Sequence, residues 1–235
     1  MSAASNDARI QAGMRRQFAL LEERKRDGAR RIGWKVGFGA PAAKEKLKIE
    51  SALVGFLLDR AVLPDGATVS LSGWSKPVAE PEIAVEIGGD VPAGASEQEA
   101  SHCVAAIGPA IELADIDGPM DDVESILAGD IFQRHVIFGP RRAVALPDGL
   151  SGLTGAVIRN GEAVPVPADL EVNTGRLLDT VRQVAATLAA FGETLRAGDV
   201  VIAGSVTPPL FLGAGDRLLS WELRPIGKIG VTFGA

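Results

Sequence analysis

The sequence predicts one substantial domain of mixed helical and strand structure, or a core with a helical extension at its N-terminus. Three observations support this. The chain has 235 residues, 46% of them hydrophobic, which is enough for a sizeable core. Apolar residues from Ile10 to Leu21 recur at helical spacing. Most later apolar segments are short runs or alternate with polar residues, which is typical of strands.

The first half of the chain is expected to contain two helices and four strands. The first helix covers 6–29, with Ser5 or Asn6 as its cap. A lysine-rich amphipathic pattern predicts a short second helix over 41–49. The turn at 64–66 (Pro-Asp-Gly) separates two of the apolar runs. These runs predict strands over 31–39, 53–58, 67–71 and 76–87.

The second half continues with three helices, a hairpin and further strands. Ser96 caps a helix over 96–107, which has acidic residues in its first turn. Apolar periodicity predicts helices over 120–130 and 177–191. The pair Asn160-Gly161 is a strong two-residue turn and predicts a hairpin over 156–166. The remaining apolar runs predict strands over 109–117, 135–139, 200–203, 217–223 and 227–233.

Composition excludes several classes of partner. A net charge of -6 argues against nucleic-acid binding, which normally needs a basic surface. The single cysteine, Cys103, cannot form an internal disulfide, and it lies in an apolar run that predicts a small buried side chain. No signal peptide is evident at the N-terminus, and no apolar run approaches the length of a membrane span. We therefore expect a cytoplasmic protein without membrane partners.

The strand over 76–87 is the stretch around which the chain is organised. Side chains two residues apart share one face of a strand, so Glu80, Glu82 and Glu86 point the same way. Adjacent carboxylates repel each other and must be solvated or bound to a cation. A solvated outer face is the simpler interpretation of a lone Glu-x-Glu. Pro81 lacks a ladder donor and suits a strand start, an edge or a bulge.

Two further strands carry an ionisable residue within an apolar pattern. Lys35 lies in a glycine-rich strand and Glu112 in the middle of another, although an edge-strand lysine reaching into water is an equal alternative. If the acids meet, three carboxylates suit a hard divalent cation such as Mg²⁺ or Mn²⁺. No histidine or cysteine pattern indicates zinc, and His102 and His135 are expected to be structural or surface residues.

The ordered set of motifs resembles one family. Five segments carry the resemblance: a Gly-aromatic-Lys-aliphatic-Gly motif, a Glu-x-Glu motif, a strand with a third acid, a C-terminal Gly-Asp-rich segment and a closing strand. They lie at 32–37, 78–84, 110–115, 195–205 and 230–233. The family is the 2-keto-4-pentenoate hydratase / 4-oxalocrotonate decarboxylase group of the fumarylacetoacetate hydrolase superfamily.

This resemblance implies an α+β fold with a rolled, mixed β-sandwich core. It implies an N-terminal helical region over 1–50 and a β-rich, metal-binding catalytic core over 51–235. Mg²⁺ or Mn²⁺ would be held by Glu80, Glu82 and Glu112, with Lys35 as the catalytic residue. The implied substrate is a small 2-oxo acid that chelates the cation and reacts through a metal-stabilised dienolate. Positions implied to contact substrate are Gly37, Phe38, Leu53, Asp130, Ser205 and Thr207.

The sequence also departs from the family pattern. Leu53 stands where hydratases commonly carry an acid, Asp117 where many members have arginine, and Asp130 where asparagine is usual. The helix over 177–191 lacks the usual tryptophan. These departures concern the substrate wall and leave the acids in place, so the substrate differs or water activation is lost.

Three functional hypotheses follow. The first is a metal-dependent lyase, either a hydratase or a decarboxylase. The second is a hydrolase of acylpyruvates or related β-diketo acids, although the histidine-glutamate pair of such C–C hydrolases is not evident. The third is a non-catalytic partner subunit, which the three acids argue against. The resemblance also implies a homo-oligomer, with association to a related decarboxylase or hydratase subunit as an option.

Overall fold

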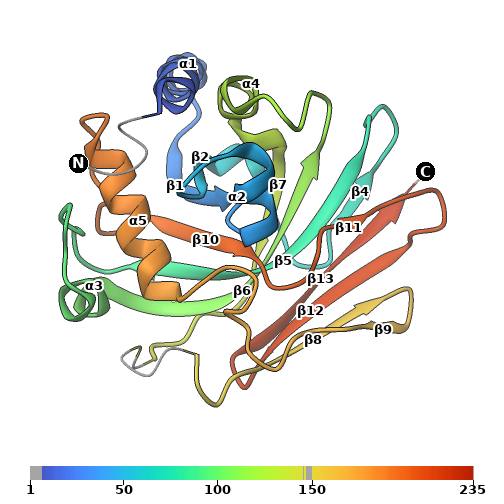
Figure 1. The fold of residues 1–235 in the computed structure, drawn as a ribbon. Helices are drawn as coiled ribbons and strands as arrows, with labels where there is room; N and C mark the ends of the chain where they lie inside the picture. The colour runs from blue at the N-terminus through green and yellow to red at the C-terminus, as the bar shows by residue number, and fades with distance from the viewer. Residues whose placement is uncertain (1–6, 145, 147–149, 235) are drawn as a thin grey trace.

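The computed structural model describes residues 7–144, 146 and 150–234, which form two β-sheets with helices packed around them (Figure 1). The larger sheet curls and has the strand order β2-β1-β10-β5-β6-β7-β3, with β11 paired to β5. The smaller sheet has the order β4-β13-β12-β8-β9. The α-helices are α1 (Ala8–Arg26), α2 (Pro41–Leu47), α3 (Glu97–Cys103), α4 (Val123–Ala128) and α5 (Leu177–Ala189).

Thirteen strands and two single turns complete the described chain. The strands of the larger sheet are β1 (Arg31–Gly37), β2 (Leu53–Leu58), β3 (Val62–Leu63), β5 (Pro77–Ile87), β6 (Val104–Asp115), β7 (Gln133–Phe138), β10 (Val200–Ser205) and β11 (Leu210–Phe211). Those of the smaller sheet are β4 (Thr68–Ser70), β8 (Thr154–Arg159), β9 (Glu162–Val164), β12 (Leu218–Arg224) and β13 (Gly227–Gly234). The single turns are η2 (Asp59–Ala61) and η3 (Asp130–Phe132).

The mixed α+β architecture is confirmed, and most elements lie within a few residues of their predicted ranges. The helix predicted over 96–107 is wrong beyond Cys103, because β6 begins at Val104 and pairs with β5. A capping box between Ser96 and Glu99 fixes where α3 starts. The β-branched residues that follow favour the strand. Cys103 packs against the main core, but it is half-buried, so the small buried side chain expected there is only partly covered.

At the N-terminus, the expected cap residues Ser5 and Asn6 lie outside the described residues. Asp7 caps α1, and its carboxylate accepts a hydrogen bond from the backbone N–H of Arg9 at 2.9 Å. The boundary expected at residue 50 stays a prediction. The strands on either side of it, β1 and β2, are antiparallel neighbours in one sheet.

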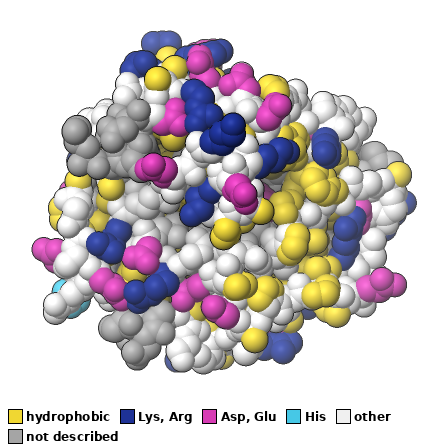
Figure 2. Space-filling view, viewed as in Figure 1, with side chains coloured by type: hydrophobic (Ala, Val, Ile, Leu, Met, Phe, Trp, Pro, Cys, Tyr) yellow, Lys and Arg dark blue, Asp and Glu magenta, His cyan; other side chains and the backbone are white. Residues whose placement is uncertain are grey.

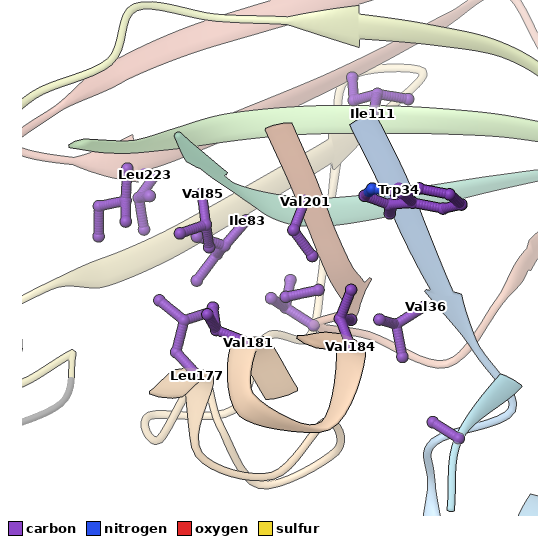
Figure 3. Packing of buried hydrophobic residues seen from close by; sticks show 14 of the residues in the cluster. Trp34, Val36, Ile83, Val85, Ile111, Leu177, Val181, Val184, Val201 and Leu223 are labelled. Carbon is purple, nitrogen blue, oxygen red and sulfur yellow. The ribbon is translucent and has the colours of Figure 1, made fainter. Parts of the chain in front are cut away.

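The main core lies between the outer face of the large sheet, α5 and the smaller sheet. Val181 and Val184 of α5 face Val36 of β1 and Val201 of β10 (Figure 3). Trp34 belongs to the same cluster and is fully buried. Since Trp34 and Val36 point outward, the residue between them on β1 points to the opposite, inner face of the sheet.

A second apolar cluster joins α1 and α4 beside β2. Gln17 of α1 is buried there and donates from Nε2 to the carbonyl of Leu127 at 3.0 Å. This packing anchors the chain that leads from α4 into the turn η3, which reaches the inner face of the large sheet. Among the described residues, no helix is both long and apolar enough to cross a membrane.

Candidate metal centre

The register of the large sheet brings four charged side chains together on its inner face. Glu80 of β5 lies directly opposite Glu112 of β6, and Glu82 follows two residues later on the same face. Lys35 comes from β1, which is separated from β5 by β10 alone. Ligand oxygens of the three glutamates lie within 4.8 Å of one another, and Lys35 Nζ donates to Glu112 Oε1.

Burial decides between the two interpretations of the Glu-x-Glu strand. Glu82 and Glu112 are at most 1% exposed, and Lys35 is 1% exposed. Glu80 is half-buried and opens to a cavity. The burial of Glu82 and Glu112 shows that a solvated outer face is wrong. The edge-strand lysine is also wrong, because Lys35 is buried and β1 has a partner strand on both sides.

Pro81 sits in the middle of β5, where a missing donor would normally break a ladder. Its carbonyl accepts a hydrogen bond from the N–H of Val206 at 2.8 Å, so its nitrogen faces the same side. On that side the neighbouring chain shifts register between Ile202 and Ser205 and then leaves to form a loop before β11. The predicted irregularity is present, but it lies in the neighbouring strand β10 and not in β5.

The hydrogen bonds of the cluster orient the carboxylates and leave oxygens available for a cation. Glu82 Oε2 accepts from the N–H of Gly204 at 2.8 Å. Glu112 uses Oε1 for Lys35, while its Oε2 is buried without a hydrogen-bond partner. An orphaned buried carboxylate oxygen is costly, and a cation would satisfy it. An all-oxygen donor set of this kind fits Mg²⁺ or Mn²⁺.

The electrostatics agree with this fit. Burial raises the pKa of Glu80 to about 7, and repulsion from Glu112 adds to the effect. Burial likewise raises the pKa of Glu82 well above its usual value, with further repulsion from the other two acids. Three ionised carboxylates would be balanced in charge by the ammonium of Lys35 and one divalent cation.

Lys35 is held in its charged form by the same acids. Burial alone would lower its pKa, but attraction by Glu112, Glu80 and Glu82 outweighs that effect and the pKa is raised. Its Nζ also donates to the carbonyl of Ile131 at 3.2 Å. Gly55 lies beside the lysine stem, where a Cβ would come within 2.9 Å of Lys35 Cγ. A side chain on Gly55 would therefore displace the lysine.

The carbonyl that receives Lys35 belongs to a strained turn. Asp130, Ile131 and Phe132 are consecutive residues with φ between 52° and 63°, in the left-handed region. Such strain in non-glycine residues is uncommon and concentrates at functional sites. Burial raises the pKa of Asp130 well above its usual range, and its Oδ1 accepts from the N–H of Phe56 at 2.8 Å.

A cavity of about 380 Å³ opens in front of these groups. Four of the six positions expected to contact substrate line it: Gly37, Phe38, Ser205 and Thr207. The other two do not. Leu53 is buried in the second apolar cluster, and Asp130 lies next to Gly55 near the Lys35 stem, outside the cavity lining. A substrate-contacting role for these two stays a prediction that their placement does not favour.

Sequence reasoning missed other parts of the cavity wall. Ile131 and Phe132 reach it through the left-handed turn, for which the only sequence signal is the Gly129-Asp130 pair. Asn173 and Thr174 line it from the loop before α5. These loop residues follow no period, so no sequence pattern predicts them.

Comparison with known proteins identifies the family of this chain. Residues 34–233 match the family model described as fumarylacetoacetate (FAA) hydrolase C-terminal. The chain belongs to this family. Within the FAA hydrolase family, the chain is 28% identical over 220 residues to 4-oxalocrotonate decarboxylase of Pseudomonas putida, covering 92% of this chain and 83% of the relative. It is also 28% identical over 221 residues to 2-hydroxyhexa-2,4-dienoate hydratase of Comamonas testosteroni, covering 91% and 82%.

Solved structures of FAA hydrolase family members extend the comparison. A 4-oxalocrotonate decarboxylase from Pseudomonas putida G7, complexed with magnesium and adipate, superposes with a TM-score of 0.84 at 25% identity. The match covers 93% of this chain and 83% of that one. A fumarylpyruvate hydrolase from Pseudomonas aeruginosa, in complex with Mn²⁺ and pyruvate, superposes with a TM-score of 0.68 at 16% identity. The match covers 87% of this chain and 89% of that one. The second similarity bears on the fold alone.

Proposed function

We propose that this protein is a divalent-metal-dependent lyase that acts on a small 2-oxo acid. It would add water to a 2-hydroxy-2,4-dienoate or remove CO₂ from a vinylogous 2-oxo diacid. One observation carries the proposal: three carboxylate oxygens within 4.8 Å of one another beside a buried lysine, at the end of an open cavity. The relatives that are decarboxylases and hydratases support the same reaction classes.

Glu80, Glu82 and Glu112 would hold Mg²⁺ or Mn²⁺. When bound, the cation would act as a Lewis acid on the 2-oxo oxygen of the substrate. Glu80 is the member of the triad that lines the cavity, so a ligand can approach the site from its side. The hydrogen bonds from Gly204 to Glu82 and from Lys35 to Glu112 hold two of the carboxylates in place.

Lys35 is the proposed catalytic residue. Lys35 lines the cavity, and its ammonium stays charged because of the surrounding acids. A fixed positive charge there stabilises the anion that develops on the substrate, and the group can also transfer a proton. Hydrogen bonds to Glu112 and to the carbonyl of Ile131 fix the ammonium before substrate arrives.

The test is a panel of 2-hydroxypenta-2,4-dienoate, 4-oxalocrotonate and an acylpyruvate, each followed by absorbance with Mg²⁺, Mn²⁺ or Zn²⁺. We expect turnover of a dienoate or of oxalocrotonate, with Mg²⁺ or Mn²⁺ better than Zn²⁺ and loss of activity with chelator. Glu82→Gln should lose metal binding and turnover together. Glu86→Gln is the matched control, since Glu86 lies on the same face of β5 but pairs with Arg141 outside the triad.

Turnover of the acylpyruvate alone would replace the lyase with a hydrolase. No turnover of any member, together with Mg²⁺ binding that Glu82→Gln does not affect, would contradict the proposed site. Association with copies of itself or with a related subunit stays a prediction.

A further inference from the structure

The floor of the cavity changes from charged to apolar along the strands that build it. On β5, Glu80 is followed on the same face by Val78, and on β6 Glu112 is followed by Ala114, with Ile116 directly after the end of the strand. Strand residues two apart are separated by about 7 Å. The register pairs Glu80 with Glu112 and Val78 with Ala114, so both strands become apolar at the same level.

The walls continue this apolar surface. Phe38, Met120, Phe132, Pro208 and Phe211 line the cavity from five different segments. Hydrophobic side chains also gather on the outside of the molecule, over the region where Figure 1 draws β11 (Figure 2). Any part of a ligand that extends away from the carboxylates therefore meets hydrocarbon on several sides.

Inside the cavity, no positive charge is available for a second anionic group. Of the described residues that line it, Lys35 is the only lysine, arginine or histidine, and its ammonium is bonded to Glu112. An unpaired carboxylate in apolar surroundings is strongly disfavoured. A charged tail would find no free cation there, because the described cavity wall offers apolar side chains and the neutral polar groups of Asn173, Thr174, Ser205 and Thr207.

Among the described residues, Lys76 is the cation whose contact with the cavity wall could oppose this conclusion. It continues the face of Val78 outward, and its exposed ammonium lies 4.6 Å from the centroid of the Phe211 ring. Lys76 is four residues from Glu80, about 13 Å along the strand. A six-carbon acid whose first two carbons lie at the carboxylate triad would end short of this rim.

We infer that the 2-oxo acid bound here has an uncharged, apolar tail and carries no second carboxylate. This rests on the proposed function, because it assumes that the 2-oxo acid end lies at Glu80, Glu82 and Glu112. It separates this chain from a decarboxylase of a short 2-oxo diacid and points to a monoacid with a hydrocarbon chain. The apolar walls bind that chain and exclude water from it.

The experiment compares pairs of probes that share a head and a length. Binding of 2-oxopentanoate against 2-oxoglutarate, and of 2-oxohexanoate against 2-oxoadipate, is measured by calorimetry with the Mg²⁺-loaded protein. Each monoacid should bind at least about tenfold more tightly than its diacid partner. Affinity should rise about fourfold for each methylene from 2-oxobutanoate to 2-oxohexanoate.

Two variants locate the effect. Ile116→Lys places a cation on the outer floor of the cavity and should reduce the difference in affinity between 2-oxohexanoate and 2-oxoadipate. Ile116→Met should leave this difference unchanged. Lys76→Met should also leave it unchanged. Diacids that bind as tightly as monoacids would overturn the inference. If Lys76→Met then weakened diacid binding, the second carboxylate would be assigned to Lys76 at the outer edge of the cavity. Failure of every 2-oxo acid, pyruvate included, to bind with Mg²⁺ would instead remove the proposed function.

Discussion

Replacing Lys35 with methionine tests the charge balance of the site. The variant keeps an unbranched apolar stem that is one atom shorter than lysine, but it removes the charge and the hydrogen-bond donors. Glu112 Oε1 and the carbonyl of Ile131 would both lose their partner in a place where Lys35 is 1% exposed. Water has little access to replace either hydrogen bond, so the full free-energy cost of both lost bonds should appear as reduced stability.

The expected effects on stability and turnover are large and separable. Removing one partner of a buried ion pair costs about 3–5 kcal/mol, which for a chain of this length lowers Tm by about 6–20 °C. Added Mg²⁺ should recover part of that loss, because it supplies positive charge to the same carboxylates. Turnover should fall by about a hundredfold to a thousandfold even with Mg²⁺ present. Lys35→Arg should not restore it, since the wider guanidinium has no room beside Gly55 and cannot release a proton.

The assay measures melting with and without Mg²⁺, Mg²⁺ affinity by calorimetry, and turnover of the best acid in the panel. Lys76→Met is the matched control, because Lys76 lies on the same sheet but is exposed. Near-normal turnover of Lys35→Met with Mg²⁺ would refute the catalytic assignment and leave the lysine a structural counter-ion. Loss of Mg²⁺ binding without loss of stability would refute the charge-balance argument.

Four further predictions concern the metal, the pH dependence of metal affinity and of stability, and the altered wall. Millimolar Mg²⁺ should raise the Tm of the wild type, because a ligand at a hundred times its Kd increases the free energy of unfolding by about 2.7 kcal/mol. The rise in Tm should disappear in Glu82→Gln, and an unchanged wild-type melting curve would count against the site. Mg²⁺ affinity should fall at least about tenfold per pH unit below about 7, because binding must displace the protons that the raised pKa values of Glu80 and Glu82 retain; a flat profile from pH 5.5 to 8 would contradict this. The raised pKa of Glu80 also favours the folded metal-free protein at low pH, and this contribution is lost as the pH rises from about 4.5 through 7. Leu53→Asp should destabilise the second apolar cluster and should not create a hydratase, since Leu53 is 1% exposed among apolar neighbours. Leu53→Met is the control, because it keeps the site apolar. A stable Leu53→Asp variant with faster hydration would show that Leu53 faces the substrate.

Local pattern was enough to place Glu80 and Glu82 on one face, but it could not say which way that face points. A two-residue period is the same for a solvated face and for one buried beneath other elements. The answer depends on strand order, and here β10 inserts between β1 and β5 although it comes over a hundred residues after them. Nothing in the period of any one strand specifies that insertion, so the meeting of Lys35 with the acids followed only from family resemblance.

The turn at 130–132 was not predictable for a different reason. Three consecutive left-handed residues contradict local preference, and only packing around them can maintain the conformation. Ile131 and Phe132 are buried, and a Cβ on Gly37 would come within 2.8 Å of Ile131 Cγ2. The strain is therefore maintained by close contact with β1. It also directs one carbonyl to Lys35 and two side chains into the cavity.

The residues that break local rules are the ones that meet. Lys35, Glu82 and Glu112 interrupt apolar strands, Pro81 interrupts a ladder, and η3 contradicts backbone preference. Each would destabilise the fold if it stood alone, since buried charge and strained backbone cost free energy. With its three carboxylates ionised, the cluster would carry two net negative charges and an orphaned oxygen beside a cavity, a combination that a divalent cation would neutralise. A fold that accepts several such local exceptions at one point is expected to have a function there, and the chemistry of these residues fits an oxygen-ligated cation.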